Sequence, residues 1–277
     1  FVAANTWSMA LIIGNPTNVY LSATYGLDFI GYLRVMILPP VAAGVIAFLV
    51  LWLLFHKELH TAITPIDEIV TIKDKGLLVL GLTHLIGCTV LLAIASYVGW
   101  EMWMIALFSV ISLYITTLIF DLFRRKKPAV LLSCTRRAPW QLVPFILSMF
   151  VIILALGECG ITAKIAAFLG NHHVIGVYGV VSALSANVIN NIPMSVLFCS
   201  LVEPLAGETQ TAAVLATVIG SNLGALLTPI GALAGIMWTG ILKKHGLAFH
   251  YGQFIAKCAP VGAAALAAAL ITLFFTR

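Results

Sequence analysis

The chain has 277 residues, of which 61% are hydrophobic and only 9% are charged, and its mean hydropathy is +1.08. A soluble globule of this length needs far more polar surface, so the composition excludes a soluble protein and indicates an integral membrane protein. The formal net charge is +5. The basic residues cluster in short loops between apolar stretches, as membrane topology requires, so we expect no nucleic-acid partner.

The first apolar segment, from Phe1 to about Tyr25, is interrupted by the run Gly14-Asn15-Pro16-Thr17-Asn18. These residue types break a helix, and non-helical backbone at bilayer depth survives only where protein or a water-filled cavity satisfies its polar groups. We therefore predict a broken transmembrane helix with a binding site at its break.

Five uninterrupted apolar stretches follow, and each approaches the roughly 20 helical residues that cross a bilayer core of about 30 Å. They cover residues 35–55, 77–98, 102–121, 139–157 and 254–275. Two polar loops, residues 56–76 and 124–137, hold nine of the fifteen Lys and Arg. Because two spans separate these loops, both face one side, which the positive-inside rule makes the cytoplasm.

The region between residues 158 and 245 has a different pattern. Residues 158–172 are more polar and are predicted to lie outside, along the membrane interface. The apolar stretches 174–187 and 192–202 are too short to cross twice, so they predict a re-entrant hairpin that enters from outside. A second broken span covers about residues 211–242, is interrupted at residues 226–232, and ends at a cytoplasmic basic cluster.

The two broken spans run in opposite directions and each precedes one intact span, which is typical of inverted-topology repeats. We therefore predict an all-α polytopic membrane protein with inverted repeats, a re-entrant hairpin and broken transmembrane helices. Residues 1–56 would end the first repeat, whose upstream part we expect before Phe1. Residues 57–75 would be a cytoplasmic linker and residues 76–277 the second repeat.

A broken helix leaves free N–H groups with partial positive charge on one side of the break and free C=O groups with partial negative charge on the other. Asparagine, serine and threonine add neutral donors and acceptors, and glycine permits close backbone approach. The predicted substrate- and ion-binding residues are Asn15, Pro16, Thr17, Asn18, Asn187, Asn190, Asn191, Pro193, Ser221, Asn222, Gly224, Thr228, Pro229 and Gly231. We expect the two breaks and the hairpin tip to meet near mid-membrane.

Ionisable residues inside the spans are scarce. The carboxylates near the spans lie at their ends, namely Asp28, Glu101, Asp121, Glu158 and Glu203, and only His84 lies clearly within one. We interpret His84 as a packed residue bonded to a neighbouring helix, with a proton relay as the alternative. A nearly charge-free site suits a neutral hydroxylated solute, or an anion held by helix ends.

The five cysteines are scattered, without a C-x-x-C pair, and we interpret them as small buried residues rather than ligands of a metalloid. They are Cys88, Cys134, Cys159, Cys199 and Cys258. The sequence brings together no nucleophile with a base and no cluster of metal-binding side chains. We therefore expect a protein that is not an enzyme and that has neither a cofactor nor a metal centre.

Several motifs stand at informative places. Ala138-Pro139-Trp140 opens a span, Asn190-Asn191-Ile192-Pro193 lies at the hairpin tip, and Gly220-Ser221-Asn222-Leu223-Gly224 precedes the second break. Together with the break at Asn15 to Asn18, they resemble motifs of the ion-transporter superfamily that contains the ArsB arsenite permeases, the NhaD-type sodium/proton antiporters and the citrate and dicarboxylate carriers. The resemblance is closest to the ArsB-like proteins.

This resemblance implies a multi-pass protein of the plasma membrane that exports arsenite and antimonite, as neutral trihydroxides, in exchange for protons. The alternatives are a sodium/proton antiporter and a citrate- or dicarboxylate-type anion carrier. The hairpin reads Ser185-Ala186-Asn187 where dicarboxylate carriers have Ser-Asn-Thr, which disfavours the last. The resemblance leaves open whether H⁺ or Na⁺ is the coupling ion, and whether the protein has a homodimeric partner or a soluble ATPase partner.

Overall fold

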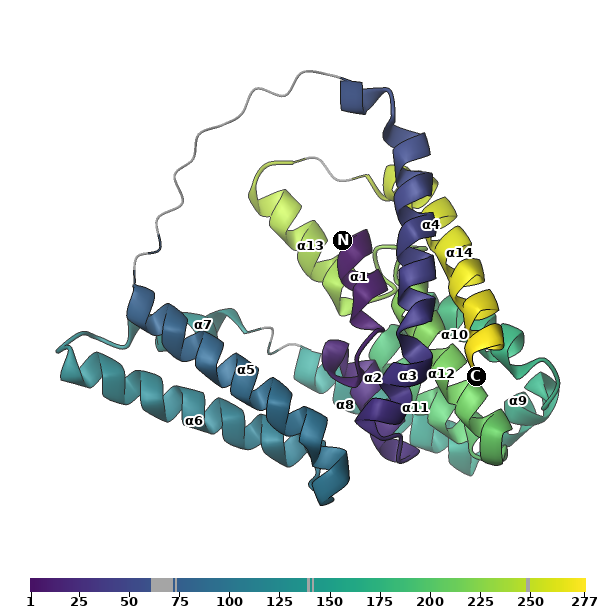
Figure 1. The fold of residues 1–277 in the computed structure, drawn as a ribbon, viewed down its shortest axis with the longest axis horizontal. Helices are drawn as coiled ribbons and strands as arrows, with labels where there is room; N and C mark the ends of the chain where they lie inside the picture. The colour runs from purple at the N-terminus through teal and green to yellow at the C-terminus, as the bar shows by residue number, and fades with distance from the viewer. Residues whose placement is uncertain (61–71, 73, 139, 141, 248–249) are drawn as a thin grey trace. The chain divides into compact units, whose positions relative to one another are not determined.

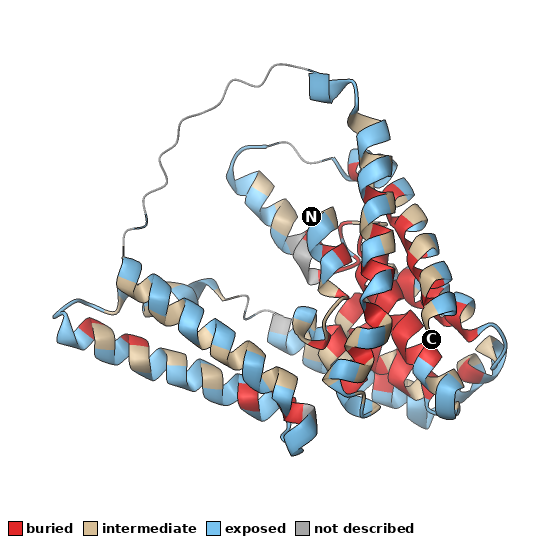
Figure 2. Cartoon of the chain, in the orientation of Figure 1, coloured by how far each residue is buried: buried red, intermediate tan, exposed pale blue. Residues whose placement is uncertain are grey.

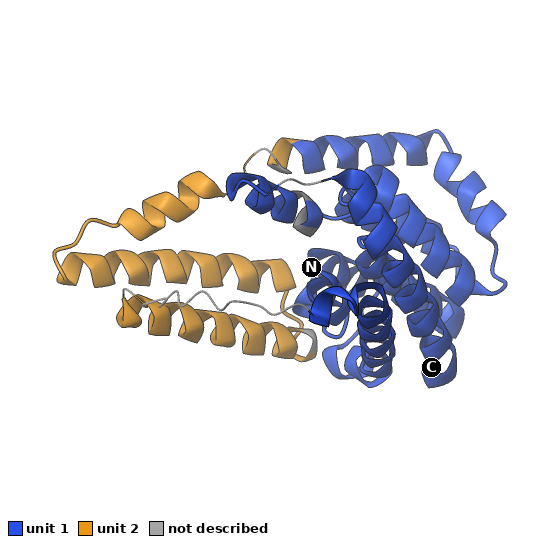
Figure 3. Ribbon diagram, turned by 90° about the horizontal axis from the view of Figure 1, so that it is seen from above, with its two compact units in different colours: residues 1–61, 145–277 blue, residues 62–144 orange. Residues whose placement is uncertain are grey.

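The computed structural model describes residues 1–60, 72, 74–138, 140, 142–247 and 250–277, and within them it contains helices and no strand. The chain divides into two compact units, shown in Figure 3. Unit 1 consists of residues 1–61 and 145–277, and unit 2 of residues 62–144. The predicted all-α fold is confirmed for the described residues.

Unit 1 begins with the first predicted broken helix (Figure 1). The two halves of this helix are α1 (Val2–Ser8) and α2 (Pro16–Thr24), with the 3₁₀ turn η1 (Ile12–Gly14) between them. Helices α3 (Phe29–Met36) and α4 (Leu38–Phe55) follow. Asn15 is the N-cap of α2, where its side chain accepts from the backbone N–H of Thr17, and Pro16 takes the first helical position, where its missing N–H costs nothing. The same residues that interrupt the apolar segment therefore start its second half.

The hairpin and the second broken helix also belong to unit 1. They comprise α10 (Val174–Ile189), α11 (Asn191–Val202), α12 (Gly207–Gly224), α13 (Leu233–Lys244) and the long last helix α14 (Tyr251–Thr276). The chain turns between α10 and α11 at Asn190, whose φ of +69° lies in the left-handed region that asparagine tolerates better than most residues. With 16 and 12 residues, α10 and α11 are shorter than a span, as the predicted hairpin requires.

A sharp bend follows the span that ends near residue 157. Helix α8 (Leu142–Glu158) and helix α9 (Ile161–Leu169) meet at an angle of 78°. Gly160, with a φ of +68°, stands at the bend. If α8 crosses the membrane, α9 runs nearly parallel to its surface, as expected for the polar stretch 158–172.

Helix α12 forms the centre of unit 1 and packs against α10, α11, α14 and both halves of the first broken helix. Buried residues concentrate in α10, α11 and α12 (Figure 2). A Cβ atom at Gly224 would lie 2.6 Å from the carbonyl oxygen of Ala183 on α10, so only glycine permits this approach. Helices α4 and α14, the intact spans that follow the two breaks, pack along one another.

Unit 2 is a helical hairpin of α5 (Lys75–Val98) and α6 (Met102–Phe123), followed by α7 (Ala129–Arg137). Arg124 Nη1 donates to the carboxylate of Asp74 at 2.9 Å, so the start of α5 and the end of α6 lie side by side. The N–H of Leu77, and then Arg124, hold the pKa of Asp74 below its ordinary value. Asp74 of the first basic loop and Arg124 of the second therefore meet at one end of this hairpin, whereas α7, which was expected to be loop, returns along α6 so that Thr135 Oγ1 lies 2.8 Å from the Tyr114 hydroxyl.

By length and composition, the described helices include four that can cross a membrane, with the bent pair α8 and α9 as a fifth. The four are Phe29–Phe55, Lys75–Ala95, Met102–Phe123 and Tyr251–Thr276. Four of the five predicted intact spans are thus present, the first beginning earlier because α3 continues into α4, while the predicted span 139–157 corresponds to α8 and qualifies only together with α9 as a bent pair. The division into inverted repeats stays a prediction, and most of the predicted linker, residues 61–71 and 73, lies outside the described residues.

The interpretation of the cysteines was partly wrong. Cys199 is buried, but Cys134 and Cys159 are exposed, because the first lies on the polar helix α7 and the second at the bend between α8 and α9. All five thiols are free.

Candidate functional site

The two breaks meet at Asn222, in the last turn of α12. Its Oδ1 accepts from Ser8 Oγ at 2.6 Å and from Asn15 Nδ2 at 3.0 Å, and its Nδ2 donates to Asn18 Oδ1 at 2.8 Å and to the Val218 carbonyl at 2.8 Å. The side chain is fully buried, and both donors and both acceptor positions of the amide are used. Asn222 therefore holds the residues of the first break against the C-terminal end of α12.

A second buried layer supports this contact. Ser221 Oγ donates to Thr17 Oγ1 at 3.0 Å, and Thr17 Oγ1 lies 3.4 Å from Asn18 Oδ1. Asn18 Nδ2 donates to the carbonyl oxygens of Ser8 and Leu11 at 2.9 and 3.1 Å. These polar side chains satisfy one another and the unwound backbone, so they hold the break rather than face a solute.

The hairpin is tied to the second break by its own asparagines. Asn187 Nδ2 donates to the Gly224 carbonyl at 2.9 Å, while its Oδ1 accepts from Thr228 Oγ1 at 2.6 Å. Asn190 Nδ2 donates to the Ile230 carbonyl at 3.2 Å. The structure thus brings the hairpin tip and the second break together, as expected.

A cavity of about 320 Å³ lies between these parts, at the lower end of the size range of small-molecule sites. Its described lining contains no ionisable side chain and consists of Ala4, Asn5, Ser8, Gly14, Asn15, Pro16, Asn191, Ile192, Ala232 and Met237. Asn15, Pro16 and Asn191 come from the first break and from the start of α11, where the sequence predicted binding residues.

Asn191 is the least satisfied polar residue of the cavity wall. Its side chain is only 4% exposed, and its buried Oδ1 has no hydrogen-bond partner among the described residues. An unpaired buried acceptor costs about 1–3 kcal/mol. Among the polar residues that line the cavity, Asn191 is thus the one with a buried side-chain acceptor that lacks a partner among the described residues.

Helix ends add to the polarity of the cavity. The N-terminal ends of α2 at Asn15, α11 at Asn191 and α13 at Ala232 all contribute lining residues. Each end carries backbone N–H groups and partial positive charge. At α2, however, Pro16 has no N–H and the N–H of Thr17 donates to Asn15 Oδ1, so this end contributes partial positive charge rather than a free donor.

The comparison with known proteins identifies the family. The family model described as "ArsB: Arsenical pump membrane protein" matches residues 1–276. The chain belongs to the ArsB family. It is 28% identical over 287 residues to an arsenical pump membrane protein of Escherichia coli, which covers 99% of this chain and 66% of the relative.

Two other relatives extend this picture. A putative arsenical pump membrane protein of Bacillus subtilis is 24% identical and covers 91% of the ArsB-family chain and 62% of its own length. An uncharacterized transporter of Mycobacterium tuberculosis is 27% identical, over 98% of the chain and 65% of its own. The chain thus spans about two thirds of the length of these relatives, and it is a multi-spanning protein of a membrane transporter family.

Within this ArsB-family chain, the predicted site residues divide into two groups. Asn15, Pro16 and Asn191 line the cavity, while the others are not among its described lining and are called supporting residues. The supporting residues are Thr17, Asn18, Asn187, Asn190, Pro193, Ser221, Asn222, Gly224, Thr228, Pro229 and Gly231. Asn5 and Ser8 also line the cavity but were not among the predicted residues; their signal is a polar pair three positions apart in the last turn before the first break.

His84 belongs to α5 of unit 2 and is not among the described residues that line this cavity. Its Nδ1 is 2.9 Å from the Leu80 carbonyl, and its Nε2 is 3.2 Å from Ser112 Oγ and 3.3 Å from Thr116 Oγ1 on α6. The interpretation of a histidine bonded to a neighbouring helix is confirmed. His84 also lines a largely apolar cavity of about 690 Å³ within unit 2, together with Glu101.

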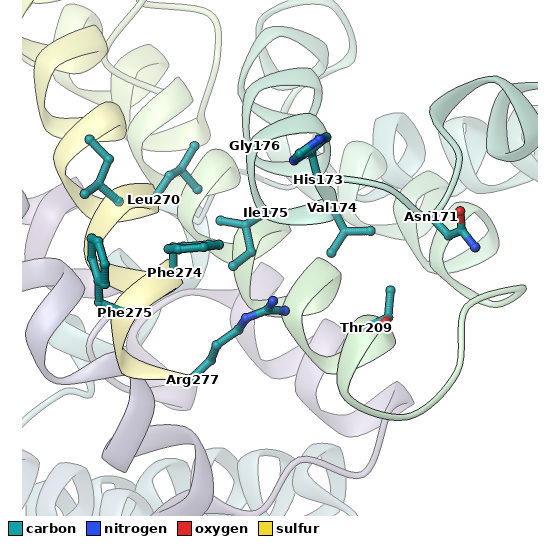
Figure 4. A pocket seen from close by; sticks show the side chains of 11 residues that line it. Asn171, His173, Val174, Ile175, Gly176, Thr209, Leu270, Phe274, Phe275 and Arg277 are labelled. Atoms are coloured by element: carbon teal, nitrogen blue, oxygen red, sulfur yellow. The ribbon is translucent and has the colours of Figure 1, made fainter.

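Another cavity, of about 560 Å³, lies in unit 1 between the start of α10 and the end of α14. Figure 4 shows Leu270, Phe274 and Phe275 of α14 along this cavity, with Arg277 and His173 beside it. None of the predicted site residues lines it, and its walls are mostly apolar. We therefore place the candidate site of the ArsB-family chain at the breaks.

Proposed function

We propose that the protein exports arsenite and antimonite, as neutral trihydroxides, across the plasma membrane in exchange for protons. The observation that carries the proposal is the buried, unpaired Oδ1 of Asn191, a residue that lines a cavity whose described lining has no charge. Membership of a family named for arsenical pumps supports the same substrate class.

The hydrogen-bonding groups of the cavity suit such a solute. Asn191 Oδ1 can accept from one hydroxyl group. The Ser8 hydroxyl donates its single hydrogen bond either to the Asn5 carbonyl or to Asn222 Oδ1, so its lone pairs remain available as acceptors. One N–H of Asn15 binds Asn222, and the other is available to donate to an oxygen atom. A neutral molecule with three hydroxyl groups both donates and accepts, as these groups require.

The two alternatives, a sodium/proton antiporter and a citrate-type anion carrier, are disfavoured because the described cavity lining has no charged side chain. Moving a charged group into the bilayer costs several kcal/mol unless it is paired, so a carboxylate-bearing solute such as citrate needs cationic side chains around it. A sodium/proton antiporter is expected to use carboxylates within the membrane. The described cavity lining provides neither kind of side chain.

The test is arsenite and antimonite accumulation in cells that lack their own efflux pump and express the full-length protein. We expect the wild type to lower accumulation of both. Asn191→Ala should reduce efflux by about fivefold or more, since a lost hydrogen bond to a buried group is worth about 1 kcal/mol or more. Asn171→Ala, at an exposed loop residue, is the matched control. Unchanged accumulation together with altered sodium tolerance or citrate uptake would contradict the proposal.

A further inference from the structure

The cavity at the breaks has a polar part and an apolar part. Its polar side chains are those of Asn5, Ser8, Asn15 and Asn191, and much of its apolar lining comes from α11 and α13. Within the described lining, the apolar part contains one sulfur atom, the thioether of Met237 on α13. The site therefore combines hydrogen-bonding groups with a single polarizable atom.

Met237 is not a residue of the hydrophobic core. It is 52% exposed, whereas Met9, Met36 and Met194 are fully buried. It lies one turn after the start of α13, whose N-cap residue Ala232 also lines the cavity. The unbranched side chain of Met237 can therefore change its rotamer beside the cavity without a change in the packing of the core.

The thiol groups of the chain lie elsewhere. None of the five cysteines is among the described lining residues of this cavity. The described part of the chain also has no group of three or more His, Cys, Asp or Glu side chains that could hold a metal ion. A solute with a soft central atom that enters this cavity therefore finds a thioether as its sulfur partner, and no thiolate.

The trihydroxides of As(III) and Sb(III) combine the same two properties. Each molecule is a pyramid with three hydroxyl groups on one side and a lone pair of the metalloid on the other. The hydroxyl groups need hydrogen-bond partners such as Asn191 Oδ1 and Ser8 Oγ. The metalloid is a soft centre, for which sulfur is a better partner than oxygen. Boric acid is also a neutral trihydroxide, but it is planar and its central atom is hard.

We propose that Met237 is a specificity-determining residue, whose thioether sulfur contacts the metalloid atom while Asn191 and Ser8 bind the hydroxyl groups. The contact is non-covalent, so no bond forms or breaks. Since antimony is larger and softer than arsenic, the site binds antimonite more tightly than arsenite, and it rejects boric acid. The inference rests on the proposed function for the identity of the solute and deepens it by naming the side chain that selects the metalloid.

The experiment measures the melting temperature of the full-length protein in detergent at increasing concentrations of antimonite, arsenite or boric acid. All samples carry Cys134→Ser and Cys159→Ser, so that the exposed thiols do not bind the metalloids. We expect a saturable rise with antimonite at the lowest concentration, then with arsenite, and none with boric acid. Met237→Leu, which removes the sulfur atom, should weaken antimonite binding by about fivefold and arsenite binding by about twofold. Met237→Ile also lacks sulfur and serves if Met237→Leu does not fold.

Two further variants separate the sulfur contact from a general change of the site. Met104→Leu, at an exposed methionine of unit 2, is the matched control and should leave both dissociation constants unchanged. Asn191→Ala should weaken antimonite and arsenite by the same factor, because it removes a hydrogen bond that both solutes make.

The ratio of the antimonite and arsenite dissociation constants decides. An unchanged ratio in Met237→Leu, a boric acid response equal to that of arsenite, or no response to antimonite in the wild type would overturn the inference. Flux of both solutes in proteoliposomes tests the proposed function separately. If antimonite binds with the expected dependence on Met237 but neither solute is transported, the proposed function fails and the assignment of Met237 stands.

Discussion

The two breaks of unit 1 both contain unwound carbonyl groups that need hydrogen-bond donors, but the donors come from different parts of the chain. At the first break, residues 9–15, the supporting amide of Asn18 comes from the first turn after the break itself. At the second break, residues 225–232, the amides of Asn187 and Asn190 come from the hairpin. Free carbonyl groups within a membrane need hydrogen-bond donors, whichever residues supply them. The carbonyl groups of Ser8 and Leu11 are thus satisfied from within the same segment, although Asn222 of α12 also binds the first break, whereas the carbonyl groups of the second break depend on the hairpin.

The largest difference between the breaks should appear at their glycines. A Cβ atom at Gly14 would clash with the backbone carbonyl of Ser8, while one at Gly231 would lie 2.6 Å from the side-chain oxygen of Asn187. Backbone cannot move aside as a side chain can. We expect Gly14→Ala to lower the free energy of unfolding by about 3 kcal/mol or more and Gly231→Ala by about 1–2 kcal/mol.

Denaturant unfolding of the purified full-length protein measures both effects. Gly240→Ala is the control, because a Cβ atom placed there meets no described atom within 4 Å beyond its own helix backbone and chain neighbours, and it should be neutral or slightly stabilising. Equal losses at Gly14 and Gly231 would show that the first break is no more rigid than the second.

A smaller contrast is expected between the two central asparagines. Asn222→Ala removes four hydrogen bonds from a fully buried position, and Asn187→Ala removes three from a partly buried one. Unpaired buried partners cost about 1–3 kcal/mol, so Asn222→Ala should lie at the upper end of that range and Asn187→Ala at the lower end. Denaturant unfolding measures both effects. A larger loss of the free energy of unfolding in Asn187→Ala than in Asn222→Ala would contradict this prediction.

The smallest effect concerns the single hydrogen bond between Thr228 and Asn187. Thr228→Val keeps the shape of the side chain and should lower the free energy of unfolding by about 1 kcal/mol. In the double variant with Asn187→Ala, the loss should be smaller than the sum of the single losses, because the two side chains share one bond. Additive losses would mean that this bond contributes nothing to the second break.

Much of this architecture could be predicted from the sequence. Helix-breaking residues act locally, so Asn15 and Pro16 marked the first break, and Asn190 marked the hairpin turn. The roles of the site residues could not be predicted, because they depend on contacts between distant positions. Asn222 meets Ser8 across 214 residues of sequence, and only the folded chain shows that its amide is saturated while that of Asn191 is not. Helix α7 was missed because its basic residues resemble a loop.

The most direct test of the account is to locate bound antimonite in the full-length protein. Antimony scatters X-rays anomalously, so crystals grown with antimonite give its position independently of the side chains around it. The account predicts an antimony peak in the cavity between Asn15 and Asn191, with oxygen atoms of the solute within hydrogen-bond distance of the Asn191 amide. A peak beside the thiol of Cys199 or Cys88, with the cavity at the breaks empty, would contradict it.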